Sequence, residues 1–163
     1  TSRSVPGAGD AFDQAIIHHM KRRHELLVGE RTAETIKMEI GSATALETPM
    51  TMEVKGRHVG RGVPIRVTIT DAEIREALAD PLKTILKVVR ETLDEIPPEL
   101  SADTYDGGIG VCGGSALLRN FDRLIHQETQ LPVQIVEQPL SAVVLGAGKM
   151  LADKELLKRL AVN

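Results

Sequence analysis

The stretch IGVCGGSALLRNFDRLIHQ, residues 109–127, decides what kind of fold this chain can form. It begins with a short apolar run, passes through two glycines and a serine, and continues at once with the apolar spacing of an amphipathic helix. Because glycine has no Cβ atom, the main chain at Gly113 and Gly114 is open to a ligand or to a tight turn. The pattern predicts a strand, a turn whose two glycines carry no side chain, and a helix that Ser115 caps.

The segments around this stretch alternate between helical and extended patterns. Apolar residues at helical spacing predict four helices before it, over 10–27, from about 29 to 41, from 70 to 79 and from 82 to 97. Extended patterns predict strands over 50–57, 63–69 and 133–137, the first two joined by a hairpin loop. A mostly helical segment from 139 to about 160 completes an α/β chain with an antiparallel insert.

Two local signals set the limits of the middle helices. Thr70 and Glu73 have the spacing of a capping box, so a helix is expected to begin there. The Asp80-Pro81 pair interrupts the helical pattern, and Pro97-Pro98 ends the helix that follows.

Composition excludes several functional classes. The net charge is −3 and aromatic residues make up 2%, so the chain has neither a basic surface nor stacking platforms for a nucleic acid. Its single cysteine excludes an internal disulfide and fits a reducing compartment. No apolar run approaches the roughly 18 residues of a membrane-spanning helix. We expect a cytosolic protein without a nucleic-acid partner and, because the sequence begins without Met, part of a longer chain.

The glycines permit more than one interpretation. Gly113 and Gly114 can admit phosphate or ribose oxygens to the start of a helix, or can form a tight turn that binds nothing. Gly108, Gly110 and Gly113 also match a dinucleotide-binding fingerprint, with Glu137 placed to bind a ribose. An NAD(P)-binding Rossmann fragment therefore stays as an alternative, although the first two glycines precede the turn where the fingerprint should begin.

Polar residues outside the glycine turn offer weaker signals. Glu34 and Lys37 share one helix face, where they can contact a ribose and its base or form an ordinary surface ion pair. His18, His19 and His24 have no acidic or cysteine ligand at matched spacing, so we expect solvated or half-buried helix residues instead of a metal site. Cys112 is expected to be a core thiol.

Several longer blocks resemble the MreB family of bacterial actin homologues, the rod-shape-determining proteins. The resemblance runs from about Val5 to Leu151. Its blocks are GAGDAFDQAII (7–17), GERTAETIKMEIGSA (29–43), IPPELSADTYDGGIGVCGGSALLRNFDRLIHQET (96–129), LPVQIVEQPL (131–140) and GAGKML (146–151). It is specific because these blocks agree with the family in both sequence and order.

The resemblance implies an actin-like (ribonuclease H-like) ATPase fold, of which this chain would be the C-terminal half with an inserted small α+β subdomain. It implies a lead-in segment, a small outer subdomain, part of the large nucleotide-binding subdomain, and a C-terminal helix that packs on the other half. These parts would span 1–10, 11–74, 75–144 and 145–163.

The same resemblance implies a function. The chain would belong to an ATP-binding, filament-forming cytoskeletal subunit that organises cell shape and cell-wall synthesis. It would act in the cytoplasm at the inner face of the membrane, with itself, the rest of the actin-like chain and the membrane-associated wall-synthesis machinery as partners. A nucleotide-free interaction module derived from this fold is a further alternative.

The resemblance also implies which residues of this chain contact ATP, because the family's binding motifs can be matched to it position by position. The segment at 33–37 matches the family's contacts to the adenosine side of ATP, and the turn at 113–116 matches its third nucleotide-binding block, with CGGS where a Thr and three glycines are usual. The implied ATP contacts are Glu34, Thr35, Ile36, Lys37, Gly113, Gly114, Ser115 and Ala116. Phosphate loops, catalytic residues and most Mg²⁺ ligands would belong to the other half, so this chain alone is not expected to hydrolyse ATP.

Overall fold

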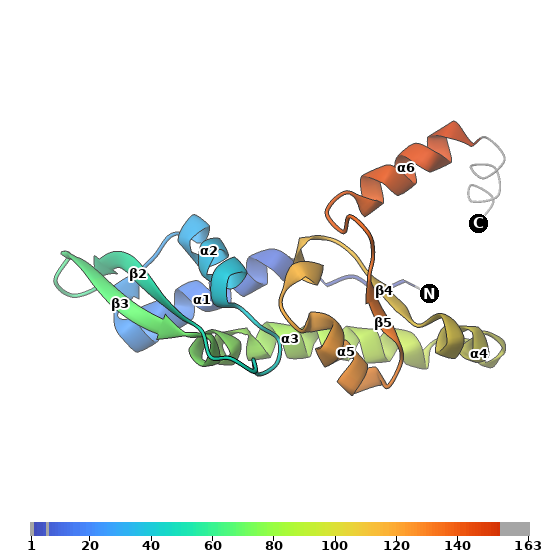
Figure 1. Ribbon diagram of the computed structural model, residues 1–163, viewed down its shortest axis with the longest axis horizontal. Coiled ribbons are helices and arrows are strands. Elements are labelled where there is room, and N and C mark those ends of the chain that lie inside the picture. Colours follow the sequence, from blue (N-terminus) through green and yellow to red (C-terminus); the bar gives the residue numbers. More distant parts are fainter. Residues whose placement is uncertain (1, 6, 154–163) are drawn as a thin grey trace.

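The computed structural model describes residues 2–5 and 7–153 (Figure 1). Its helices are α1 (Ala8–His24), α2 (Glu30–Ile40), α3 (Asp71–Asp94), α4 (Pro98–Gly107), the 3-10 helix η1 (Gly114–Leu117), α5 (Phe121–Thr129) and α6 (Ala142–Ala152). Its strands are β1 (Leu26–Leu27), β2 (Thr51–His58), β3 (Pro64–Thr70), β4 (Ile109–Val111) and β5 (Val133–Ile135). None of the described helices is both long and apolar enough to cross a membrane.

The strands form two separate sheets. One is antiparallel with the order β1-β2-β3, and its β2–β3 hairpin pairs Thr51 with Thr70 and Arg57 with Pro64. The predicted hairpin is confirmed, with both strands shifted by one residue along the chain. The other sheet is the parallel pair β4–β5, whose connection carries η1 and α5. A parallel pair needs such a crossover, so the glycine turn lies where the first strand of the pair ends.

The core forms around α1, which packs against both α2 and α3. Its members are aliphatic side chains with two phenylalanines, as a composition poor in aromatic residues requires. Fully buried examples are Phe12, Ile16, Met20, Leu26, Ile36, Ile69, Ile74 and Leu78. The same cluster continues to Phe121 and Ile125 of α5, so one core joins the insert to the region around the glycine turn.

Helix α3 is continuous, and the prediction of two helices separated at Asp80-Pro81 is wrong. Proline within a helix removes one backbone hydrogen bond and normally costs about 3 kcal/mol or more. Here Pro81 lies inside a helix whose buried positions, Ile74, Leu78, Leu82 and Leu86, recur every four residues on both sides of it. Burial of this stripe outweighs the local defect. The predicted capping box at Thr70 and Glu73 is confirmed.

Two expectations after α3 are also corrected. Pro97-Pro98 ends one helix but also begins α4, with Pro98 at the first helical position, where a missing N–H costs little. After the glycines the chain forms only the short 3-10 helix η1. The longer helix α5 begins separately at Phe121, and the residue before it, Asn120, has a φ of 59°. Ser115 makes no capping hydrogen bond, so the prediction that it caps the helix is wrong.

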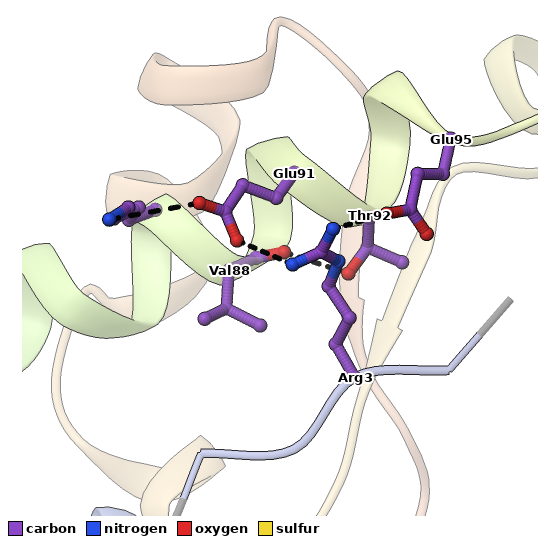
Figure 2. Close-up of polar contacts among 6 residues, drawn as sticks. Arg3, Val88, Glu91, Thr92 and Glu95 are labelled. Carbon is purple, nitrogen blue, oxygen red and sulfur yellow. Dashed lines mark hydrogen bonds and ion pairs between the residues drawn. The ribbon is translucent and has the colours of Figure 1, made fainter.

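The two ends of the described chain differ. Arg3 bridges Glu91 of α3 and Glu95, the residue just after that helix, with 2.7 Å between its guanidinium and the Glu91 carboxylate. These ion pairs hold the first residues along α3 (Figure 2). Helix α6 instead projects away from the other elements (Figure 1). Residues 154–160 of the predicted terminal helix lie outside the described residues. All three predicted subdomain boundaries fall within helices, namely α1, α3 and α6.

Candidate functional site

A pocket of about 390 Å³ lies where one face of α2 meets the turn that follows β4. Its lining combines apolar and polar groups: Phe12, Glu34, Lys37, Met38, Gly114, Ser115, Leu117, Leu118 and Leu140. A second hollow of about 400 Å³ lies beside the end of α3, and no predicted site residue lines it in the described chain. The first pocket is therefore the candidate site.

The fold brings four predicted site residues together in this pocket. Glu34 and Lys37 come from α2, whereas Gly114 and Ser115 come from η1, almost eighty positions later in the chain. Apolar side chains from α1, α2 and the segment before α6 line the remaining wall. Phe12, Met38 and Leu140 were missed from the sequence, because nothing in their local pattern separates a pocket residue from a core or surface residue.

Four other predicted residues do not line the pocket. Ile36 and Ala116 are fully buried in the core. Thr35 is exposed and its hydroxyl donates a hydrogen bond to the Arg31 carbonyl at 2.9 Å, within its own helix. Gly113 precedes the lining residue Gly114. The side chains of Thr35, Ile36 and Ala116 therefore do not line the pocket.

Lys37 is held by an ion pair that the sequence did not indicate. Its Nζ lies 2.8 Å from Asp13 Oδ1 on α1, and both side chains are largely buried, with exposed fractions of 17% and 16%. Glu34, the residue predicted as the alternative partner, is exposed and forms no ion pair with the described residues. The pocket thus presents a free carboxylate beside an ammonium whose charge is already balanced.

The conformation of the turn explains its first glycine. Gly113 has φ 86° and ψ 174°, a region of backbone space that is almost restricted to glycine. Its N–H donates to the Pro139 carbonyl at 2.8 Å, so this group holds the turn to the segment after β5. A Cβ on Gly114 would lie 3.6 Å from Leu140 Cδ2, an ordinary contact on the pocket wall. Gly113 is therefore required by the backbone, and Gly114 leaves space in the pocket.

The first glycine of the dinucleotide-type pattern, Gly108, has a packing explanation. A Cβ on Gly108 would lie 2.3 Å from the Pro132 carbonyl oxygen, and Gly108 has a positive φ of 68°. Close approach of the two chain segments before β4 and β5 therefore requires this glycine. Cys112 is exposed, so its prediction as a core thiol is wrong.

The histidines differ from one another in their surroundings. His18 is exposed, His24 is half-buried, and His19 is buried, contrary to expectation. Burial lowers the pKa of His19 below its ordinary value. Burial alone would raise the pKa of Glu73, but the Thr70 backbone N–H and nearby His24 outweigh it and hold that pKa below its ordinary value. These groups lie outside the pocket.

Comparison with known proteins identifies the family. The model of the family described as MreB/Mbl protein matches residues 1–159. The chain belongs to the MreB/Mbl family. Over 150 residues, this MreB/Mbl chain is 47% identical to the cell shape-determining protein MreB of Escherichia coli (strain K12), an alignment that covers 92% of the chain and 43% of that protein.

Solved structures agree with this assignment. MreB5 of Spiroplasma citri, in crystal structures bound to ADP and to AMPPNP, is 34% identical. The TM-scores are 0.89 and 0.88, covering 99% and 98% of this chain but 48% and 47% of MreB5. The MamK double helical filament, at 18% identity, has a TM-score of 0.68 over 83% of this chain and 42% of its own, and shows the fold alone.

The predicted fold class is confirmed, because the MreB/Mbl chain matches actin-like structures over nearly all its length. The Rossmann-type alternative is therefore set aside. The chain spans less than half the length of each of these relatives.

Proposed function

We propose that this MreB/Mbl chain forms the adenosine-facing wall of an ATP-binding cleft in a filament-forming, actin-like cytoskeletal subunit. The observation that carries this proposal is the single pocket formed by the Glu34–Lys37 face of α2 and the Gly114–Ser115 turn. The nucleotide-bound structures of the 34% identical MreB5 support a nucleotide as its ligand.

Each side of the pocket suits a different part of adenosine. The Glu34 carboxylate accepts hydrogen bonds only, which matches the hydroxyl donors of a ribose. Met38 and Leu140, both exposed on the pocket wall, offer apolar surface for the base. At Gly114 the backbone can approach the ribose or the first phosphate closely, because no side chain intervenes.

The charge in the pocket favours adenosine over the triphosphate tail. Among the described residues that line the pocket, Lys37 is the only cation, and Asp13 balances its charge at 2.8 Å. The β- and γ-phosphates and Mg²⁺ would therefore be held mainly by the rest of a longer actin-like chain. Phosphoryl transfer needs metal, phosphate cradle and an oriented water together, so we expect no ATP hydrolysis by this chain alone.

Calorimetry with ADP and with AMPPNP tests the pocket assignment. Glu34→Ala should weaken binding by roughly tenfold or more, the range for a hydrogen bond to a charged group. Glu39→Ala is the matched control, because Glu39 is exposed on the same helix and does not line the pocket. Equal affinities of both variants would contradict the assignment, and absence of any nucleotide binding would favour the interaction-module alternative.

The proposal extends to assembly and to the cell. We expect the small outer subdomain, predicted over 11–74, to contribute to a head-to-tail filament contact. We also expect cytoplasmic polymers at the inner membrane face that organise cell shape with the wall-synthesis machinery. Reversal of exposed charges at Lys55 and Arg57 on β2 should reduce sedimentation of polymer by the complete protein. Unchanged sedimentation would show that Lys55 and Arg57 do not take part in the filament contact.

A further inference from the structure

The end of α1 and the start of α3 bring together three side chains that can bind a metal ion. His19 and His24 belong to α1, and Glu73 lies in the first turn of α3. One ligating atom from each lies within 4.8 Å of the other two. His24 Nε2 is 3.1 Å from Glu73 Oε1, and the rings of His19 and His24 are 6.3 Å apart between centroids.

The buried ring of His19 has a nitrogen without a partner in the described chain, and the ion pair between His24 and Glu73 does not account for it. Its side chain is only 5% exposed, and its Nε2 atom has no hydrogen-bond partner among the residues that the structure describes. Buried polar atoms in folded proteins nearly always have a partner, and an unpaired one requires an explanation. A metal ion bound at this nitrogen would supply the partner that it lacks.

Glu73 is already oriented by the capping box. The Thr70 backbone N–H donates to Glu73 Oε2 at 3.0 Å, and the Thr70 hydroxyl donates to the same oxygen at 3.3 Å. The other carboxylate oxygen, Oε1, is the one that faces His24. Such outer contacts fix ligand direction in metal sites, so this carboxylate needs little reorganisation to bind an ion.

We propose that His19, His24 and Glu73 bind a divalent transition-metal ion of the Zn²⁺ type, which joins α1 to α3. Two histidines and one glutamate form a known ligand set for zinc that leaves a fourth position for water. Ligands at about 2.0–2.1 Å from a tetrahedral ion lie about 3.4 Å from one another. The 3.1 Å separation of His24 Nε2 and Glu73 Oε1 is close to this value, and the ligating nitrogen of His19 lies within 4.8 Å of both atoms.

The chemistry of the ligands separates this site from the nucleotide pocket. Imidazole favours zinc, cobalt, nickel and copper, whereas Mg²⁺ and Ca²⁺ select oxygen ligands in larger numbers. None of the three side chains lines the pocket between α2 and η1 in the described chain. The metal site is therefore independent of the proposed ATP function, and nucleotide-free protein suffices to test it.

Titration of the metal-free protein with Zn²⁺ and with Co²⁺ tests the site. We expect one Zn²⁺ per chain by calorimetry, a visible absorption spectrum of tetrahedral Co²⁺ that Zn²⁺ displaces, and a rise in Tm that EDTA reverses. Mg²⁺ should produce none of these changes. Absence of stoichiometric Zn²⁺ binding would overturn the proposal.

Matched variants assign the ligands. His24→Ala and Glu73→Gln should each weaken Zn²⁺ binding by at least about tenfold, because loss of an outer-shell partner alone costs that much. His18→Ala is the control, since His18 is the exposed neighbour of His19 and should leave affinity within about twofold. His24 is half-buried, so its variant is expected to fold, and circular dichroism without metal verifies this. Wild-type affinity in both ligand variants would show that the ion binds elsewhere.

Discussion

Helices α1 and α6 show opposite relations between composition and burial. The last turn of α1 is basic, with Lys21, Arg22 and Arg23, yet the helix buries Phe12, Ile16, His19 and Met20. In α6 only Lys149 is charged, yet none of its residues is buried in the described chain. Val143 and Val144 of α6 are 69% and 72% exposed. Apolar composition therefore does not determine whether a helix is buried.

The difference comes from what lies opposite each helix. α1 packs against α2 and α3, whose apolar residues also face the core. α6 projects from the described chain (Figure 1). Leu140, just before the helix, and Val143 and Val144 within it are open to solvent. Large exposed apolar side chains that gather on one surface are typical of an interaction site. The family resemblance implies that this helix packs on the other half of a longer protein.

The largest expected effect lies in the α1 core. Ile16 is fully buried, so Ile16→Ala should lower the free energy of unfolding by about 2–5 kcal/mol. Urea denaturation followed by circular dichroism measures the change. A loss below 1 kcal/mol would mean that α1 is not the centre of the core and would remove the contrast with α6.

The next effect distinguishes the two glycines of the turn. Gly113→Ala should destabilise the protein by about 1–3 kcal/mol, because its backbone conformation is strained for any residue with a Cβ. Gly114→Ala should change stability less and weaken nucleotide binding more, since its methyl group would enter the pocket beside Leu140. Unfolding and nucleotide titration of both variants measure the two effects. The assignment would be contradicted if Gly114→Ala lost more stability and Gly113→Ala lost more nucleotide affinity.

Loss of the cap at the start of α3 should have a smaller effect. Thr70→Ala removes the side-chain acceptor for the Glu73 N–H, which should cost about 1 kcal/mol. Thr84→Ala is the control, because the exposed Thr84 hydroxyl bonds only within its own helix, to the Asp80 carbonyl. Thermal unfolding of the two variants compares them. An equal Tm for both would show that tertiary packing alone determines where α3 begins.

The smallest effect is expected in α6. Val144→Ser should change the stability of this 163-residue chain by less than about 0.5 kcal/mol, as at other exposed positions. If a longer chain covers α6, the same change there should cost about 1–3 kcal/mol through lost apolar burial. Chemical denaturation of both proteins provides the measurement. A large loss in the short chain would show that α6 already has a partner.

The sequence by itself determined those features that depend on neighbours within one or two helical turns. The limits of α2 at Gly29 and Gly41, the Thr70–Glu73 capping box and the β2–β3 hairpin all follow from local spacing, and the structure confirms them. The placement of Glu34 and Lys37 on one helix face has the same origin, because residues three apart are neighbours on any α-helix. The long blocks that resemble the MreB family can also be recognised from the sequence alone.

Only the tertiary structure decided the features that depend on distant parts of the chain. Pro81 remains inside α3 because a buried stripe continues past it, and Lys37 pairs with Asp13 because α1 packs beside α2. Glu73 lies beside His24 for the same kind of reason, although 49 positions separate them. Residue type limits what a side chain can bind, bury or pair with. The packing of helices from separate parts of the sequence decides which of those partners is within reach.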